Sequence, residues 1–143
     1  MTTAWFQKKI SLPAQRRGCH LVTADLVRQL PELKSYKVGL ANFFLQHTSA
    51  ALTLNENYDS DVRLDMETAL NRLAPENAKY RHDAEGPDDM PGHIKSSLLG
   101  ASVMVPIQNG KLALGTWQGI WLCEHRDSAH GRNVLVTIQG EKS

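Results

Sequence analysis

A chain of 143 residues, 41% hydrophobic and 22% charged, has the size and composition of one globular domain with a substantial core. Its formal net charge of +1 argues against a nucleic-acid binder that works through a broad basic surface. No apolar run approaches a membrane span, and no apolar signal region follows the N-terminus, so we expect a cytoplasmic protein without a membrane partner. Cys19 and Cys123 form no Cys-x-x-Cys pair, which suits a reducing compartment and indicates no disulfide framework.

The first half of the chain alternates between apolar runs and polar connections. The predicted strands are residues 4–12, 36–46 and 50–54. A helix is expected to begin with Thr23 as its N-cap and to stop near Pro31. The clearest helix follows Asp59 or Ser60, either of which can cap it, and ends before Pro75. Its apolar residues recur at helical spacing and predict one buried face: Val62, Met66, Ala69, Leu70 and Leu73.

The last third of the chain is rich in strands. A short helix is predicted at 93–99, stopped by Gly100. Asn109-Gly110 is a strong hairpin signal, and the strands of a predicted meander are 101–107, 111–115, 119–125 and 132–139. Together these elements predict one α+β domain over residues 1–143, with a mostly antiparallel sheet and two main helices.

The segment from His82 to Ser97 combines two histidines with four carboxylates, and glycine and proline lie between them. Proline removes backbone donors and glycine weakens regular structure, so we expect a shaped loop. Histidine and carboxylate side chains bind divalent metals and transfer protons. A solvated acidic loop is the alternative interpretation.

Three histidines are candidate metal ligands. His47 lies at a predicted strand end, and His82 and His93 bracket the acidic residues. Three neutral imidazoles and a water would form an open, catalytic type of site. Sequence spacing alone does not bring them together, and a histidine at a strand end is often only a hydrogen-bonded structural residue.

Other polar residues lie near predicted element ends. Glu56 and Glu124 could serve as general bases or support metal ligands, or they could be helix caps and surface ion-pair partners. In Gly115–Gly119, the Trp117 indole could stack on a flat ring while Gln118 binds its edge. A tryptophan buried at a hairpin junction is the alternative. No P-loop, dinucleotide fingerprint, nucleophile elbow or His-Glu-x-x-His motif occurs, which argues against common nucleotide-dependent phosphotransfer.

Several motifs occurring in order resemble those of the small YjbQ-like proteins, a family often labelled secondary thiamine-phosphate synthases. They are Gln46-His47-Thr48-Ser49-Ala50, Leu54-Asn55-Glu56-Asn57, the His82–Ser97 segment, Gly115-Thr116-Trp117-Gln118-Gly119-Ile120, Glu124-His125-Arg126 with Arg132, and Ile138-Gln139-Gly140-Glu141. The resemblance covers essentially the whole chain. It implies a compact α+β fold, a homotrimer, a polar pocket with a metal site, and weak joining of a pyrimidine methyl diphosphate to a thiazole phosphate with release of pyrophosphate. Many such proteins carry an Asp-Gly-Pro-Arg-like turn before the last strand, of which only Arg132 carries over here.

This resemblance gives a leading hypothesis for the site. His47, His82 and His93 would hold a divalent metal, either zinc or magnesium, and Glu56, Asp61 and Glu85 would be the catalytic or supporting acids. The residues expected to bind a small phosphorylated substrate are Lys95, Ser96, Trp117, Gln118 and Arg132. If the trimer forms, we expect the pocket near a subunit boundary. A binding module without turnover and a metal-dependent hydrolase are the alternatives.

Overall fold

Two antiparallel sheets make up the strand layers of the computed structural model, which describes residues 2–128 and 130–143. The first sheet has the order β1 (Thr3–Leu12), β8 (Arg132–Lys142), β3 (Tyr36–Leu45), β5 (Ser102–Gln108) and β6 (Lys111–Leu112). The second has the order β2 (Gly18–Leu21), β7 (Gln118–Glu124) and β4 (Ala50–Glu56). The helices are α1 (Thr23–Arg28), the 3-10 helix η1 (Pro31–Ser35), α2 (Ser60–Leu73) and α3 (Asp89–Leu99).

The main core lies between the two sheets. Alternate residues of β3, β5 and β8 point into it, as the two-residue period of a strand requires. The central strand β7 is buried on both faces, because Ile120 and Leu122 join this core while Trp121 and Cys123 join a second apolar cluster. Val62 and Met66 of α2 pack on that second cluster. The α+β class was expected from the sequence, whereas the arrangement in three layers, with two sheets, was not.

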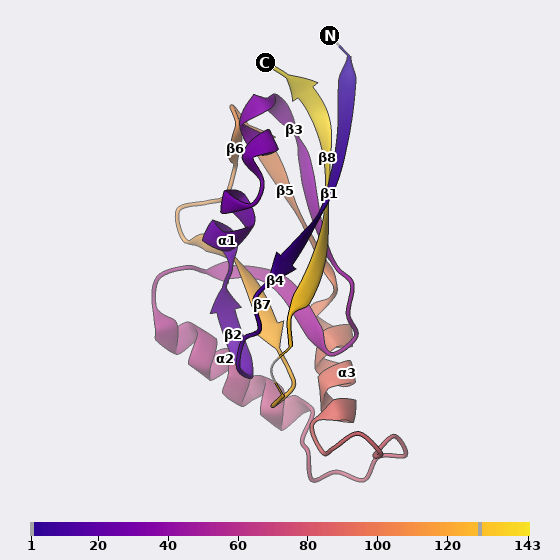
Figure 1. Cartoon of the computed structure of the whole chain (residues 1–143). Coiled ribbons are helices and arrows are strands. Elements are labelled where there is room, and N and C mark those ends of the chain that lie inside the picture. The colour runs from indigo at the N-terminus through magenta and orange to yellow at the C-terminus, as the bar shows by residue number, and fades with distance from the viewer. Residues whose placement is uncertain (1, 129) are drawn as a thin grey trace.

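Helices α2 and α3 lie at the end of the molecule opposite the chain termini (Figure 1). Helix α2 packs on β2, and α3 packs on β4. Asp59 caps α2, since its Oδ1 accepts the backbone N–H of Asp61 at 2.9 Å. One of the two predicted caps is therefore confirmed, and the segment between α2 and α3 is held at this end of the molecule.

The predicted hairpin turn is confirmed. Asn109 and Gly110 join β5 to β6 with φ angles of 50° and 77°, and two successive positive φ angles are the signature of a type I′ turn. Gly110 also lies against η1, where an added Cβ would come within 2.9 Å of the Lys34 carbonyl oxygen. Glycine is thus required here both by conformation and by space.

The region before α1 differs from the prediction. Residues 18–21 form the edge strand β2 rather than the approach to a helix, because they pair with β7. The N-cap position is Val22, and the Thr23 hydroxyl accepts the N–H of Ile120 at 2.8 Å instead of capping α1. Tertiary pairing with β7 therefore decides the conformation of this segment.

The segment from His82 to Ser97 was expected to be a shaped loop leading into a short helix at 93–99, and the predicted start of that helix is wrong. Helix α3 begins at Asp89, four residues before the predicted start at His93. Pro91 is tolerated because it is the third residue of the helix, where the backbone N–H has no partner within the helix. Gly92 allows close packing on His125, whose Cβ would lie 3.4 Å from a Cβ added at position 92.

The predicted meander is also wrong in one respect. Strand β7 leaves the first sheet and becomes the centre of the second, while β8 returns to lie between β1 and β3. The outward face of the first sheet carries large exposed hydrophobic residues: Trp5, Val38, Leu40, Phe44 and Met104. No helix in the described part of the chain is long and apolar enough to cross a membrane.

Candidate metal centre

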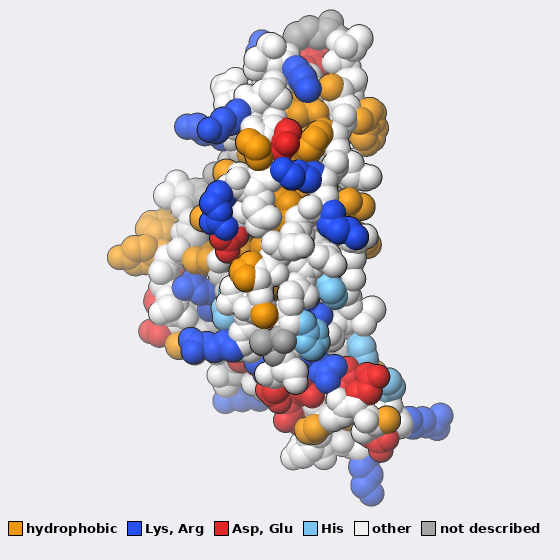
Figure 2. Space-filling model, viewed as in Figure 1, with side chains coloured by type: hydrophobic (Ala, Val, Ile, Leu, Met, Phe, Trp, Pro, Cys, Tyr) orange, Lys and Arg blue, Asp and Glu red, His pale blue; other side chains and the backbone are white. Residues whose placement is uncertain are grey.

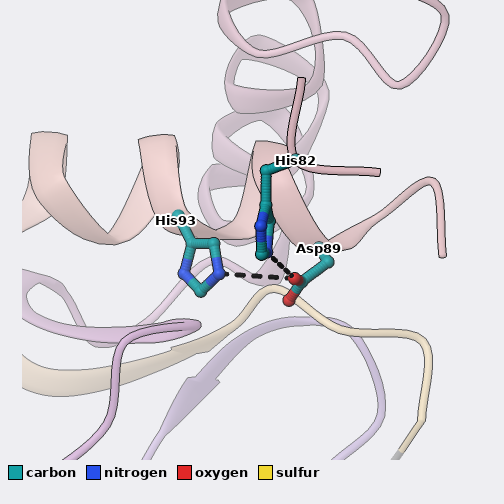
Figure 3. A group of neighbouring side chains, drawn as sticks. All are labelled: His82, Asp89 and His93. Carbon is teal, nitrogen blue, oxygen red and sulfur yellow. Dashed lines mark hydrogen bonds and ion pairs between the residues drawn. The ribbon is translucent and has the colours of Figure 1, made fainter. Parts of the chain in front are cut away.

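Histidine and acidic side chains gather at the end of the molecule that holds α2 and α3 (Figure 2). Three of them, His82, Asp89 and His93, offer ligand atoms that all lie within 4.8 Å of one another. Asp89 and His93 are four residues apart and so lie on one face of α3, whereas His82 comes from the preceding segment (Figure 3). Asp89 Oδ2 lies 2.6 Å from His82 Nε2 and 3.4 Å from His93 Nε2.

The hydrogen bond on the far side of the His93 ring sets its tautomer. His93 Nδ1 lies 2.8 Å from the Thr48 carbonyl oxygen, which can only accept, so Nδ1 carries the hydrogen. With the hydrogen on Nδ1, the neutral form of the ring would present the Nε2 lone pair to Asp89 Oδ2, and a cation between the two atoms would replace repulsion with attraction. A backbone carbonyl behind the ring is the usual support of a metal-binding histidine.

Arg126 fixes the carboxylate of the group. Its Nη1 donates to Asp89 Oδ1 at 2.5 Å, its Nε donates to Asp88 Oδ2, and its Nη2 donates to the Glu85 carbonyl. Asp89 Oδ2 is thereby left facing the two imidazoles (Figure 3). One guanidinium thus orients the ligand and ties down the segment that precedes α3.

Asp89 is a buried but ionised carboxylate. Burial raises its pKa, but hydrogen bonds with His82 and Glu85 and the nearby charges of His93 and Arg126 lower it, and the net result is a pKa below the usual value. The Glu85 side chain is thus close enough to Asp89 to affect its pKa, and its catalytic role stays a prediction. An anionic oxygen with two imidazoles is a donor set that suits Zn²⁺ and other divalent transition metals.

A cavity opens beside this group. It has a volume of about 540 Å³, and its lining includes Lys79, Tyr80, His82, Met90 and Pro91. The His82 side chain is half exposed, while that of Asp89 is almost fully buried. A small molecule in the cavity can therefore reach the His82 side of the group.

The third predicted histidine, His47, is not a member of the group. Its Nε2 accepts the backbone N–H of Asn133 at 2.8 Å, at the start of β8. Burial and the charge of Arg132 lower the His47 pKa, so the ring is neutral near pH 7. His47 precedes Thr48, the residue that holds His93, and its role as a metal ligand stays a prediction.

Three residues expected to bind phosphate are buried and occupied by protein partners. Lys95 Nζ donates to Asn71 Oδ1 at 2.7 Å, and Ser96 Oγ donates to the Ala50 carbonyl. Arg132 forms a two-point ion pair with the buried Glu124. These contacts join α3 to α2 and β4, and β8 to β7, so the observed role of the three is structural. Substrate binding by them stays a prediction.

The remaining predicted residues lie at the start of α2. Glu56 Oε1 accepts the Asp59 N–H, and Asp61 is in the first helical turn. Trp117 is exposed and lies edge-on to Tyr58, while Gln118 Oε1 accepts the Gly115 N–H. Helix α2 is about 21 Å long, and the His82 segment follows its C-terminal end. Within one chain, these residues and the candidate metal ligands therefore lie near opposite ends of α2. The tryptophan is not buried at the hairpin junction.

Two residues of the candidate metal centre were missed from the sequence, Asp89 as a possible ligand and Arg126 as its hydrogen-bond partner. The spacing Asp89-x-x-x-His93 is the signal that could have found the ligand, because residues four apart share one face of a helix. Recognising it required α3 to begin at Asp89. No local signal points to Arg126, which is 37 residues away from Asp89.

Known proteins resemble this chain over nearly its full length. A family model described as UPF0047 protein YjbQ-like matches residues 8–141. The chain is 52% identical to UPF0047 protein YjbQ of Escherichia coli O157:H7, over 96% of this chain and 99% of that protein. It is 50% identical to UPF0047 protein sll1880 of Synechocystis, over 94% and 92% of the two chains.

Crystal structures of similar proteins have the same fold. A YbjQ-like protein of unknown function from Sulfolobus solfataricus superposes with a TM-score of 0.84 and 27% identity, covering 98% of this chain and all of that chain. An uncharacterised conserved protein of the yjbq/upf0047 family from Clostridium acetobutylicum gives a TM-score of 0.80 and 38% identity, over 92% and 98% of the chains.

Proposed function

The chain belongs to the YjbQ-like UPF0047 family, and we propose that it is a metal-dependent enzyme that acts on a small phosphorylated substrate. The observation that carries this proposal is the grouping of His82, Asp89 and His93 within 4.8 Å at the edge of a cavity. Two of the three candidate ligands are oriented by partners that a solvated acidic loop does not need. His93 is held by a backbone carbonyl, and Asp89 is held by Arg126.

The donor set favours zinc over magnesium. Magnesium prefers an octahedron of oxygen ligands and keeps most of its water, whereas two imidazoles and one carboxylate are a common zinc set. His82, Asp89 and His93 would hold such an ion, and the half-exposed side of His82 would give a substrate or water access to it. We therefore propose Zn²⁺ or a similar transition metal as the cofactor.

The residues around the group have distinct tasks in a reaction from which a phosphate or diphosphate leaves. A bound divalent cation supplies positive charge that stabilises the departing oxygen anion. Lys79 lines the same cavity and adds a second positive charge for phosphate oxygens. The Glu85 carboxyl, which influences the Asp89 pKa, would accept or return a proton in this reaction.

The reaction we propose is slow thiamine-phosphate synthase activity, in which a pyrimidine methyl diphosphate joins a thiazole phosphate and pyrophosphate leaves. Its support is the set of motifs that resembles secondary thiamine-phosphate synthases. Trp117 and Gln118 would contact the flat pyrimidine ring. Within one chain, however, they lie near the start of α2, whereas the candidate metal ligands lie near its end. We propose that the chain is a homotrimer and that its pocket takes residues from two subunits.

A metal-dependent hydrolase is the second candidate function. The half-exposed face of His82 leaves room for water as well as for a substrate. The two candidates differ in their co-substrate. A synthase releases pyrophosphate only when the thiazole phosphate is present, whereas a hydrolase cleaves the phosphorylated substrate alone.

Zinc titration followed by calorimetry tests the metal site directly. We expect His82→Ala, His93→Ala and Asp89→Asn each to weaken zinc binding at least about tenfold, because each removes one of three ligands. His20→Ala is the matched control, since His20 Nε2 bonds to the Arg16 carbonyl and lies outside the group. His47→Ala decides whether the predicted third histidine contributes. Zinc affinity that is equal in wild type and all three ligand variants would refute the site.

Turnover is measured as pyrophosphate release from the two purified substrates with zinc-loaded protein. We expect a slow rate in wild type that His82→Ala abolishes. Trp117→Ala should chiefly raise the KM, because stacking contributes to binding. A rate that is equal in wild type and His82→Ala would contradict the synthase proposal while leaving the zinc result intact.

A further inference from the structure

The two free cysteines of the chain are direct partners across two strands. Cys19 of the edge strand β2 lies opposite Cys123 of β7 in the antiparallel register. Their positions in the sequence gave no sign of this, since they are separated by most of the chain. Both side chains lie on the helix-facing side of the second sheet, where Cys19 packs against the cluster of Trp121, Cys123 and Ala51.

The hydrogen bonds of the ladder show which kind of pair this is. The Val22 N–H donates to the Ile120 carbonyl at 2.9 Å, so Val22 and Ile120 occupy a hydrogen-bonded position. Positions alternate along an antiparallel ladder, which makes Cys19 and Cys123 a non-hydrogen-bonded pair. Cα atoms in such pairs are about 4.5 Å apart, within the range of about 4.4–6.8 Å that disulfides span.

We propose that Cys19 and Cys123 form a reversible dithiol–disulfide site that reacts with low-molecular-weight disulfides such as oxidised glutathione. This inference is independent of the proposed enzymatic function. It is also compatible with a protein whose cysteines are normally reduced, because a disulfide between two paired strands can be reduced again without unfolding of the chain.

The two cysteines have unequal environments, and this sets the order of the reaction. Cys19 is partly exposed on an edge strand, whereas Cys123 is fully buried. The Cys19 side chain and burial both raise the Cys123 pKa, which keeps that thiol protonated and unreactive toward outside reagents. Attack therefore begins at Cys19.

The chemistry balances in two exchange steps. The Cys19 thiolate attacks one sulfur of oxidised glutathione, the small disulfide bond breaks, and one glutathione thiolate leaves. Cys123 then loses its proton and attacks the Cys19 sulfur, and the second glutathione leaves. Two protein thiols are oxidised to one disulfide, and one glutathione disulfide is reduced to two thiols.

The disulfide would join two segments that hold the candidate metal centre. Arg17, two residues before Cys19, binds Glu67, Asn71, Glu76 and Asp127. Arg126, three residues after Cys123, holds Asp89. Oxidation would therefore link the edge strand β2 covalently to β7, the strand that leads into the candidate metal centre.

Intact-mass measurement of the folded chain tests the proposal. The protein is incubated with oxidised glutathione, then denatured and alkylated. We expect wild type to lose about 2 Da and to take up no alkyl group, and dithiothreitol should reverse the change. The oxidised form should also melt at least about 5 °C higher than the reduced form, because the new bond closes a long loop.

Two variants make the result specific. Cys19→Ser should stay unreacted, because the remaining thiol is buried. Cys123→Ser should stop at the mixed disulfide, with a gain of about 305 Da. Wild type that alkylates at both cysteines, holds glutathione stably on Cys19, or forms disulfide-linked dimers would overturn the proposal. The wild-type and Cys19→Ser results decide it even if Cys123→Ser does not fold.

Discussion

His125 has an environment very different from that of a free side chain in water. It lies fully buried at the end of β7, and neither ring nitrogen has a hydrogen-bond partner among the described residues. Burial, followed by the charges of Lys95, Arg132 and Arg17, lowers its pKa to about 3. The ring is therefore neutral in the folded protein at any pH near neutrality.

This lowered pKa predicts a loss of stability on mild acidification. Below about pH 6.5 the unfolded chain binds a proton on His125 that the folded chain does not bind, so the free energy of unfolding falls as pH falls. The limiting slope for one such group is about 1.4 kcal/mol per pH unit. The loss continues until the pH approaches the folded pKa of about 3.

Urea denaturation at about pH 7 and about pH 5 measures the effect. We expect His125→Phe to lose clearly less stability between these values than wild type does, because phenylalanine does not titrate. His20→Phe serves as the control, since His20 lies on the edge strand β2 and bonds to the Arg16 carbonyl. The same pH dependence in wild type and His125→Phe would rule out this cause.

At the scale of single residues, the sequence was informative about residue types and uninformative about partners. His82, His93 and Glu85 stand out because their side chains cluster within a short segment, and they do lie together. Choosing Asp89 among four neighbouring carboxylates requires the contact with Arg126, which only the fold creates. Lys95 looked available for phosphate, yet it is completely buried and its ammonium donates to Asn71 of α2.

Among the elements, the turn between β5 and β6 makes the sharpest demand on its sequence. Gly110 combines a φ angle of 77° with a close approach to the backbone of η1. Gly100, after α3, has a φ angle of 99° but nothing within 4 Å of an added Cβ. Comparing substitutions at the two glycines therefore separates the cost of backbone strain from the cost of steric overlap.

We predict that Gly100→Ala costs about 1–2 kcal/mol of stability through backbone strain alone. Gly110→Ala should cost at least about 1 kcal/mol more, because its Cβ would press on the Lys34 carbonyl oxygen, which belongs to the backbone. Chemical denaturation of both variants and wild type measures the difference. Equal losses of stability in the two variants would mean that η1 shifts away from the added Cβ without a cost in free energy.

At the scale of elements, local sequence signals were sufficient to predict the features that are determined by residues close together in the sequence. The hairpin at Asn109-Gly110 and the Asp59 cap of α2 are determined by neighbouring residues, and both were predicted. Strand β2 has only four residues and forms because β7 is beside it, so no local pattern indicates it. The placement of β7 in the second sheet depends likewise on long-range pairing with β2 and β4.

For the molecule as a whole, the exposed face of the first sheet is the feature that calls for a partner. Its large hydrophobic residues lie on three strands, at Trp5, Val38, Leu40, Phe44 and Met104. Apolar surface shared by neighbouring strands is costly in water, and a closed symmetric oligomer is a common way to cover it. We therefore expect this face to be buried in the proposed homotrimer.

Light scattering coupled to gel filtration tests this expectation. We predict about three times the chain mass of 15.9 kDa at micromolar concentration. The double change Leu40→Glu and Phe44→Glu should yield monomers, because it places charges in the apolar contact. Leu73→Glu is the matched control, since Leu73, which was wrongly predicted to be buried, is exposed on α2, away from this sheet. A monomer mass for wild type would contradict the trimer.

The position of β8 between β1 and β3 also determines when the first sheet can form during synthesis on the ribosome. Strand β1 pairs along its whole length with β8, from Thr3 opposite Glu141 to Leu12 opposite Arg132. The first ten-residue strand to be made must therefore wait for the last strand before it has a neighbour. Contacts between such distant parts of a chain form slowly, because a long loop must close first. The nascent chain thus carries an unpaired hydrophobic strand until residues 132–142 have emerged, which makes this interval the one in which it depends most on protection from aggregation.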